Sequence, residues 1–102
     1  MADLIFLKKT TSIRPIEEYT TSHDNENFMS EMRSIRDQMI AEGKTDGKAW
    51  IREIPGNQME VTRKWVDQSS ADEWVVKWVA VLEKYQLSYI SIVVDDIGSL
   101  VF

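Results

Sequence analysis

The chain has 102 residues, 43% of them hydrophobic and 28% charged, which is ordinary for a domain that buries its own core. Its net charge of −5 and scattered basic residues argue against nucleic-acid binding and against a polybasic membrane surface. The chain contains no cysteine, which excludes disulfides, thiolate nucleophiles and cysteine-bound metals. Because no apolar run reaches a membrane span and the first residues lack the order of a secretory signal, we expect one cytoplasmic domain over residues 1–102.

The N-terminal quarter of the chain predicts a strand followed by a long connection. Large apolar residues at successive positions indicate a strand over Leu4–Lys8, covered on both faces. The polar segment Thr10–Asn27 then predicts an irregular connection with a short helical turn near Pro15–Tyr19. Connections of this length in compact domains often carry function.

A first amphipathic helix is expected over Glu26–Glu42. Its apolar stripe, at spacings of four, three and four residues, consists of Phe28, Met32, Ile35 and Met39. Gly43 supplies the left-handed residue that commonly ends a helix, and Asp46-Gly47 is a turn pair.

Two strands joined by a tight turn should follow. Ala49–Ile54 and Gln58–Val66 flank Pro55-Gly56-Asn57, and so short a link forces an antiparallel hairpin. In the second strand polar and mostly apolar residues alternate, which places Arg63 and Trp65 on the more apolar face.

The last third predicts a second helix and a fourth strand. Ser70 and Glu73 have the spacing of a capping box, and the helix continues to about Lys84. Ser88–Val94 is β-branched and alternating. The complete order, βαββαβ, predicts an α+β ferredoxin-like domain whose four-stranded antiparallel sheet has two helices on one face.

Both faces of the predicted sheet carry large apolar side chains. Leu4 and Phe6 alternate with Ile5 and Leu7, Trp50 and Ile54 with Ile51, and Ile90, Ile92 and Val94 with Tyr89 and Val93. Two helices cover only one face, and an exposed apolar patch normally marks an interface or a ligand site. We therefore expect a homodimer in which two open sheet faces pack together. The alternatives are a monomer with stray apolar surface residues and a sheet presented to a different protein.

The element order and the passage from Arg63 to Trp74 resemble the dimeric α/β-barrel superfamily, in particular its antibiotic-biosynthesis-monooxygenase-like members. The resemblance implies a homodimeric barrel with a cavity between sheet and helices. It also implies that some relatives oxygenate aromatic substrates without metal or flavin, so no cofactor is expected. Haem-degrading members need a histidine on the second helix, and Ser70–Lys84 contains none.

Seven residues are candidates for the cavity. They are Trp50, Arg63, Trp65, Tyr89, Tyr19, His23 and Arg36. A charge on an apolar face needs a partner, so Arg63 should contact either a ligand anion or Glu53 across the hairpin. His23 is the one side chain that titrates near neutrality, and it is either a general base or a solvated residue of the connection.

The other candidates have structural alternatives of their own. Trp50 and Trp65 could line a cavity, although packing in the core or at the dimer interface is the commoner role. Tyr19 and Tyr89 could donate phenolic hydrogen bonds, and Arg36 could lay its stem over the edge of the core. The adjacent carboxylates of Asp95-Asp96 lack further ligands at defined spacing, so no metal site is expected.

These observations favour a small dimeric α/β-barrel protein that binds a small apolar or aromatic ligand or a protein partner. The alternative is a cofactor-independent monooxygenase acting on an aromatic molecule, with Trp65, Arg63 and Tyr89 around its cavity. A regulatory module that presents its sheet to another protein is the third possibility.

Overall fold

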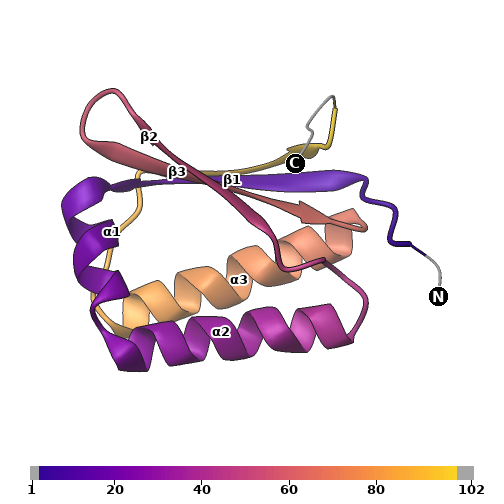
Figure 1. Ribbon diagram of the computed structural model, residues 1–102, viewed down its shortest axis with the longest axis horizontal. Coiled ribbons are helices and arrows are strands. Elements are labelled where there is room, and N and C mark those ends of the chain that lie inside the picture. The colour runs from indigo at the N-terminus through magenta and orange to yellow at the C-terminus, as the bar shows by residue number, and fades with distance from the viewer. Residues whose placement is uncertain (1–2, 99–102) are drawn as a thin grey trace.

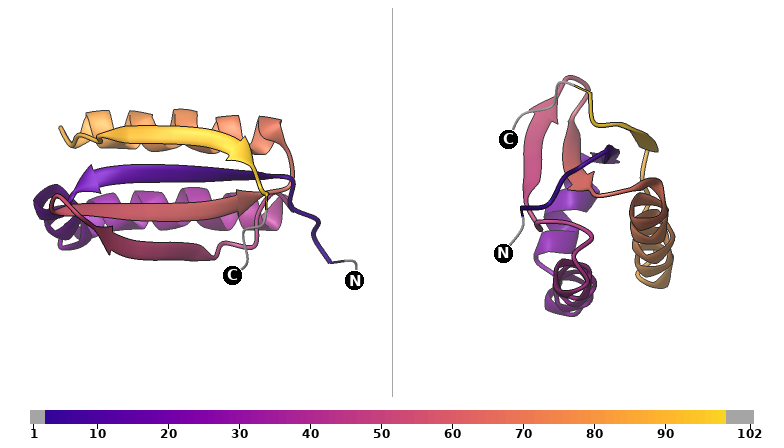
Figure 2. Two further views of the ribbon diagram at one scale, coloured as in Figure 1. Left: turned by 90° about the horizontal axis from the view of Figure 1, so that it is seen from above. Right: turned by 90° about the vertical axis from the view of Figure 1, so that its right-hand side faces the viewer.

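The computed structural model describes residues 3–98, which form an α+β arrangement with the helices on one face of a sheet (Figures 1 and 2). The elements are β1 (Lys8–Pro15), α1 (Ile16–His23), α2 (Glu26–Ala41), β2 (Ala49–Ile54), β3 (Gln58–Trp65), α3 (Gln68–Lys84) and β4 (Ser91–Asp96). The strands form one antiparallel sheet in the order β2-β3-β1-β4. This arrangement is compatible with the predicted ferredoxin-like fold, with α1 as an additional helix.

The first strand lies further along the chain than its predicted position. Of the predicted strand Leu4–Lys8 only Lys8 belongs to β1, which instead takes up the first third of the segment expected to be irregular. The expected helical turn near Pro15 is real but extends to His23 as α1. The error has a physical cause. The buried side chains of β1 are polar, so this central strand lacks the apolar alternation by which strands are recognised.

The middle of the chain follows the prediction closely. β2 has the predicted bounds, while β3 and α2 each end one residue early. Gly43 has a φ of +72°, as expected for the residue that follows a helix. The hairpin register pairs Ala49 with Arg63 and Glu53 with Met59. The expected contact between Arg63 and Glu53 is therefore wrong, because Arg63 lies four positions further along β3 than Met59, the residue opposite Glu53.

The last helix begins earlier than predicted, because a different residue caps it. The Asp67 carboxylate accepts a hydrogen bond from the Ser70 backbone N–H at 2.8 Å, and α3 starts at Gln68. The expected capping box is wrong, since the Glu73 carboxylate instead forms ion pairs with Lys44 and Lys77, both at 2.7 Å. β4 starts at Ser91 rather than Ser88, because the Ser88 backbone N–H and hydroxyl donate to the Glu18 carboxylate of α1.

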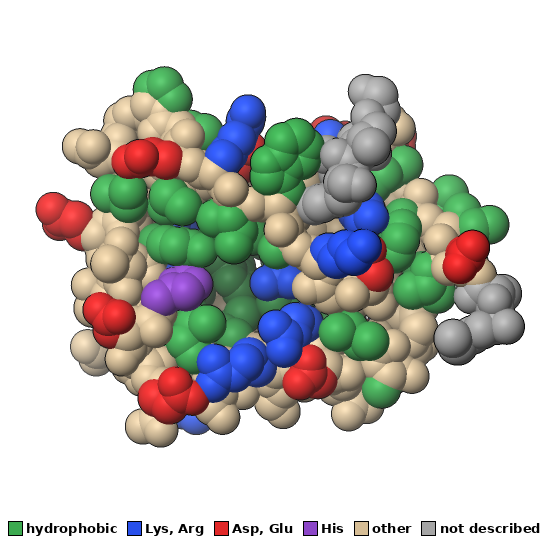
Figure 3. Space-filling view, in the orientation of Figure 1, with side chains coloured by type: hydrophobic (Ala, Val, Ile, Leu, Met, Phe, Trp, Pro, Cys, Tyr) green, Lys and Arg blue, Asp and Glu red, His purple; other side chains and the backbone are tan. Residues whose placement is uncertain are grey.

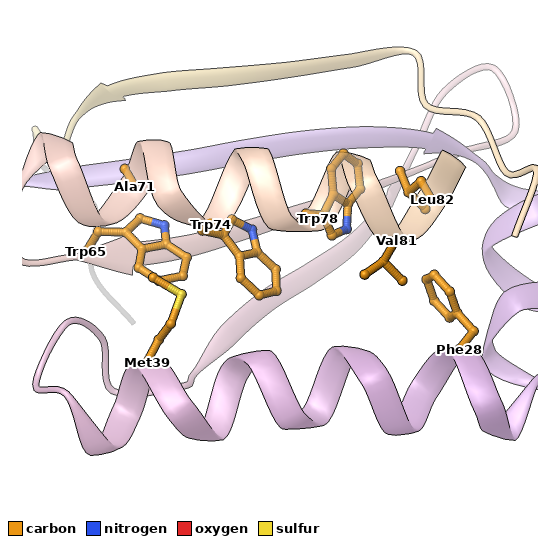
Figure 4. Packing of buried hydrophobic residues seen from close by; sticks show 8 residues of the cluster. All are labelled: Phe28, Met39, Trp65, Ala71, Trp74, Trp78, Val81 and Leu82. Carbon is orange, nitrogen blue, oxygen red and sulfur yellow. The ribbon is translucent and has the colours of Figure 1, made fainter. Parts of the chain in front are cut away.

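The hydrophobic core lies where α2 and α3 face the sheet (Figure 4). Its buried members are Phe28, Met39, Trp65, Ala71, Trp74, Trp78, Val81 and Leu82. Trp65, only 1% exposed, donates its indole N–H to the Thr10 hydroxyl at 2.9 Å and lies 5.4 Å from the Trp74 ring. Five of these eight residues come from α3, which packs against β1, β3 and β4, while α2 packs on α1 and α3.

The sheet face opposite the helices is of mixed character. The register aligns Trp50, Thr62, Thr11 and Val93 in one row that crosses all four strands. Trp50 is 46% exposed and Val93 is 50% exposed. In the next row along, Arg52 of β2 forms a 2.7 Å ion pair with Glu60 of β3.

Candidate functional site

A hollow lies between the helices and the sheet. It has a volume of about 90 Å³. Its lining residues are Thr10, Ser12, Arg14, Tyr19, His23, Phe28, Met29, Met32, Ile51, Val61, Arg63, Trp74 and Trp78. Figure 3 shows its mouth between the sheet and α2, with the single histidine on one side and basic side chains on the other. A space of this volume has room for several water molecules or for a small organic ligand.

The floor of the hollow is the helix-facing side of β1 and β3. Side chains of a strand alternate between faces, so Thr10, Ser12 and Arg14 all point toward the helices, and all three are buried. Arg63 of β3 pairs with Thr10 in the register and lies on the same face. The centre of the sheet thus presents two guanidinium groups and two hydroxyls where a core would have aliphatic side chains.

Arg14 is held by oxygen atoms from two sides. Its guanidinium donates to the Ser22 hydroxyl at 3.0 Å and to the backbone carbonyls of Glu18 and Ser88, both at 3.4 Å. The Phe28 ring centroid lies 5.9 Å away. Burial lowers the pKa of Arg14 from its ordinary value, although nearby Glu18 opposes this effect. The group remains charged, because arginine is effectively always protonated.

Arg63 has fewer partners. Its guanidinium stacks over the Trp74 ring, 4.9 Å from the centroid, and donates one 3.4 Å hydrogen bond to the Gly47 carbonyl. The nearby carboxylate of Asp46 is bound by Lys64 at 3.2 Å. Burial lowers the pKa of Arg63, and the neighbouring Arg36 charge lowers it further.

Tyr19 and His23 form the wall that α1 contributes. They are one helical turn apart, with ring centroids separated by 4.1 Å. His23 Nδ1 lies 2.8 Å from the Tyr19 carbonyl, and since a carbonyl only accepts, Nδ1 carries the proton. Nε2 of the neutral ring then holds the lone pair. Burial raises the pKa of Tyr19, whereas the positive charges of Arg14 and Arg63 act in the opposite direction and lower it.

The remaining walls are apolar. Phe28, Met29 and Met32 come from α2, and Trp74 and Trp78 from α3. Trp74 and Trp78 are four residues apart, which places them on one side of α3, and the Trp74 ring points toward α2 (Figure 4).

Of the seven residues predicted for the cavity, three line the hollow: Tyr19, His23 and Arg63. The other four lie elsewhere. Trp65 is in the core, Trp50 is on the opposite sheet face, Tyr89 packs its ring 5.4 Å from that of Trp78, and Arg36 forms a 3.0 Å ion pair with Asp37.

Sequence reasoning missed Arg14, Trp74 and Trp78 as lining residues. The two tryptophans belong to both the core and the lining of the hollow. Arg14 had a detectable signal. Thr10, Ser12 and Arg14 follow one another at spacings of two before a proline, which is the pattern of a strand with one polar face.

Residues 3–98 include no helix long and apolar enough to cross a membrane. Within the same range, no three histidine or acidic side chains are grouped so that they could hold a metal ion. No family model matches the chain, and no curated protein matches its sequence.

Proposed function

We propose that this chain binds a small aromatic molecule in the hollow and works as a homodimer of the dimeric α/β-barrel type. One observation carries the ligand proposal. At the centre of the sheet, four polar side chains face the helices, opposite aromatic side chains of those helices. They are Thr10, Ser12, Arg14 and Arg63. Buried polar groups are costly in a core, and residues that break local folding rules concentrate at functional sites.

The aromatic character of the walls supports a ring-shaped ligand. Trp74 and Trp78 present ring surfaces from α3, and Phe28 does so from α2. Offset or edge-to-face contact between rings contributes about 0.5–1.5 kcal/mol beyond simple burial. A flat ligand would thus be held between aromatic walls while its polar atoms met the hydroxyls and guanidinium groups of the floor.

The exposed row on the other sheet face supports the dimer. Trp50 and Val93 stand at its two ends, both about half exposed. Burying a large apolar side chain contributes roughly 1.5–3 kcal/mol, so a few such residues per copy favour association. Packing of two sheets face to face would cover this row and leave both hollows open to solvent on the outside.

Native mass spectrometry tests both parts of the proposal at once. We expect a dimer that carries a retained small molecule, or that gains the mass of added phenol. Met32→Trp should abolish this adduct by filling the hollow, whereas Val76→Trp, on the exposed side of α3, should leave it unchanged. A monomer with no adduct under any condition would contradict the proposal.

A second candidate is a cofactor-independent oxygenase, favoured by the position of His23. Its Nε2 lone pair lies on a residue that lines the hollow, so it could take the proton of a phenolic ligand. Oxygen uptake with hydroquinone as the probe should then occur in the native chain and disappear in His23→Gln, with binding of the probe retained. Equal uptake in both proteins would exclude this role for His23.

A further inference from the structure

We infer that the ligand is an anion, namely a single-ring aromatic carboxylate whose carboxyl group is bound by Arg63. This inference rests on the proposed binding of an aromatic ligand in the hollow and specifies the chemistry of that ligand. Its basis is the charge of the lining, the unused donors of Arg63 and the size of the space.

The lining is positive in a chain that is otherwise acidic. Arg14 and Arg63 make it so, and none of its residues is Asp or Glu. The chain as a whole carries a net charge of −5. A cleft of one sign with low-dielectric walls concentrates ligands of the opposite charge. A neutral aromatic ligand would gain nothing from this arrangement.

Arg63 has N–H donors that form no hydrogen bond within the described part of the protein. A guanidinium has five N–H donors, and the single hydrogen bond to Gly47 is long at 3.4 Å. Within residues 3–98 no carboxylate forms an ion pair with Arg63, and the nearby Asp46 is bound by Lys64. No side-chain nitrogen within residues 3–98 is both fully buried and without a partner, so the nitrogens of Arg63 that form no hydrogen bond retain contact with solvent-accessible space. The forked geometry of a guanidinium suits bidentate binding of a planar carboxylate.

The stack with Trp74 fixes the orientation of Arg63. At 4.9 Å from the ring centroid, the guanidinium is held against an aromatic surface that also lines the hollow. A carboxylate bound to Arg63 therefore places its attached ring close to the tryptophans of α3. The acid group and the ring of one ligand are thus recognised by adjacent side chains.

Arg14 has a different part in this site. Each of its three nitrogens already donates one hydrogen bond, to Ser22 or to a backbone carbonyl, so Arg14 acts on the ligand mainly through its positive charge. The positive charges of both arginines act on the Tyr19 hydroxyl, which can donate a hydrogen bond to the same anion.

The size of the hollow limits the ligand to one ring. Its volume of about 90 Å³ is smaller than an engineered cavity of about 150 Å³ that binds benzene. The hollow is open to solvent (Figure 3), so part of the ligand can stand in the mouth. The further rings of a fused polycyclic acid would lie outside the hollow, so we expect them to add no contact within it.

An NMR titration of the native chain with benzoate and with benzamide tests the inference. The two probes share ring and carbonyl, and only benzoate is charged. The indole N–H signals of Trp74 and Trp78 should shift, while that of Trp50, on the opposite face, should not. Because charge-assisted hydrogen bonds are stronger than neutral ones, we expect benzoate to bind about tenfold to a hundredfold more tightly.

The outcomes separate the inference from the proposed function. Equal affinity for the two probes would overturn the carboxylate and leave aromatic binding intact. Absence of binding by either probe would overturn both. Inorganic phosphate serves as a third probe, and phosphate binding as tight as that of benzoate would show a general anion site, which also contradicts the inference.

Arg63→Gln locates the charge recognition, with Arg52→Gln as its matched control. Arg52 lies on the opposite sheet face in a 2.7 Å ion pair with Glu60. We expect Arg63→Gln to lose the preference for benzoate while keeping its affinity for benzamide, and Arg52→Gln to behave as the native chain. A preserved preference in Arg63→Gln would overturn the role of Arg63. If this variant fails to fold, Arg63→Lys, which keeps the charge but lacks the fork, should show a weakened preference instead.

Discussion

Thr10 is the residue that joins the core to the floor of the hollow. Its hydroxyl accepts the indole N–H of Trp65 at 2.9 Å, and both side chains are almost completely buried. Removing one partner of a buried hydrogen bond leaves the other unsatisfied, which is costlier than the bond itself is favourable.

We predict that Thr10→Val lowers the free energy of unfolding by about 1–3 kcal/mol, because it leaves the indole N–H of Trp65 without an acceptor. Thr11→Val is the matched control. It makes the same change on the same strand but on the face away from the helices, and should alter stability by less than about 0.5 kcal/mol. Urea denaturation followed by tryptophan fluorescence measures both. Equal effects of the two substitutions would contradict the importance of the bond.

At the scale of single residues, the sequence predicted part of the lining of the hollow. The spacing and residue types singled out Tyr19, His23 and Arg63, which the fold brings to one hollow. The role of Trp65 could not be settled, because an aromatic residue on a strand face suits core and cavity equally well. Arg14 was missed because its burial depends on partners from α1 and from the segment before β4, distant in the chain.

Among the elements, α3 depends on its first residues for both stability and position. The Asp67 side chain accepts the Ser70 N–H, and this contact keeps the pKa of Asp67 below its usual value. Asp67→Ala should destabilise the protein by about 0.5–2 kcal/mol, whereas Asp67→Asn should retain most of the stability, because asparagine caps as well as aspartate. Thermal unfolding compares the two variants. Equal losses would show that the charge, rather than the cap, is what matters.

A second interaction of α3 ties it to the loop after α2. Lys44 and then Lys77 hold the pKa of Glu73 below its ordinary value of 4.5. A depressed carboxylate pKa adds stability that is present above the unfolded-state pKa and is lost as pH falls through the lower folded-state value.

We therefore predict that Glu73→Gln is less stable than the native chain at neutral pH and that the difference is lost progressively as the pH falls below 4.5 toward the lowered folded-state pKa of Glu73. Glu83→Gln, at an exposed position of the same helix, is the control and should show no such dependence. Denaturant midpoints measured between pH 3 and pH 7 provide the comparison. A difference that stays constant over this range would rule out the ion pairs as its origin.

Element boundaries could be predicted where the signal was local. The hairpin between β2 and β3 is defined by Pro55-Gly56-Asn57, and the end of α2 by Gly43, so both were found. The bounds of β1 and β4 depend on pairing between distant segments, which their own residues do not reveal. The inward side chains of β1 are polar because they form the floor of the hollow. This strand therefore lacks the apolar alternation that would identify it from sequence.

For the molecule as a whole, the two sheet faces have different roles. The helix-facing side contains the core and the hollow, while the opposite side presents the row from Trp50 to Val93. Its charged neighbours Arg52 and Glu60 neutralise each other, so they do not oppose contact between two acidic chains at this face. Association through this face would keep the hollow of each copy accessible to ligand.

The dimer can be tested by placing one charge on each side of the molecule. Val93→Lys introduces a lysine into the open face, whereas Val76→Lys makes the same change at a position of α3 that is 69% exposed. We expect the native chain and Val76→Lys to sediment as dimers, and Val93→Lys to dissociate at least about tenfold more readily, because a buried unpaired charge is unfavourable. Sedimentation velocity over a dilution series measures this. A native chain that is monomeric at every concentration, or a Val93→Lys dimer as stable as the native one, would place the interface elsewhere or remove it.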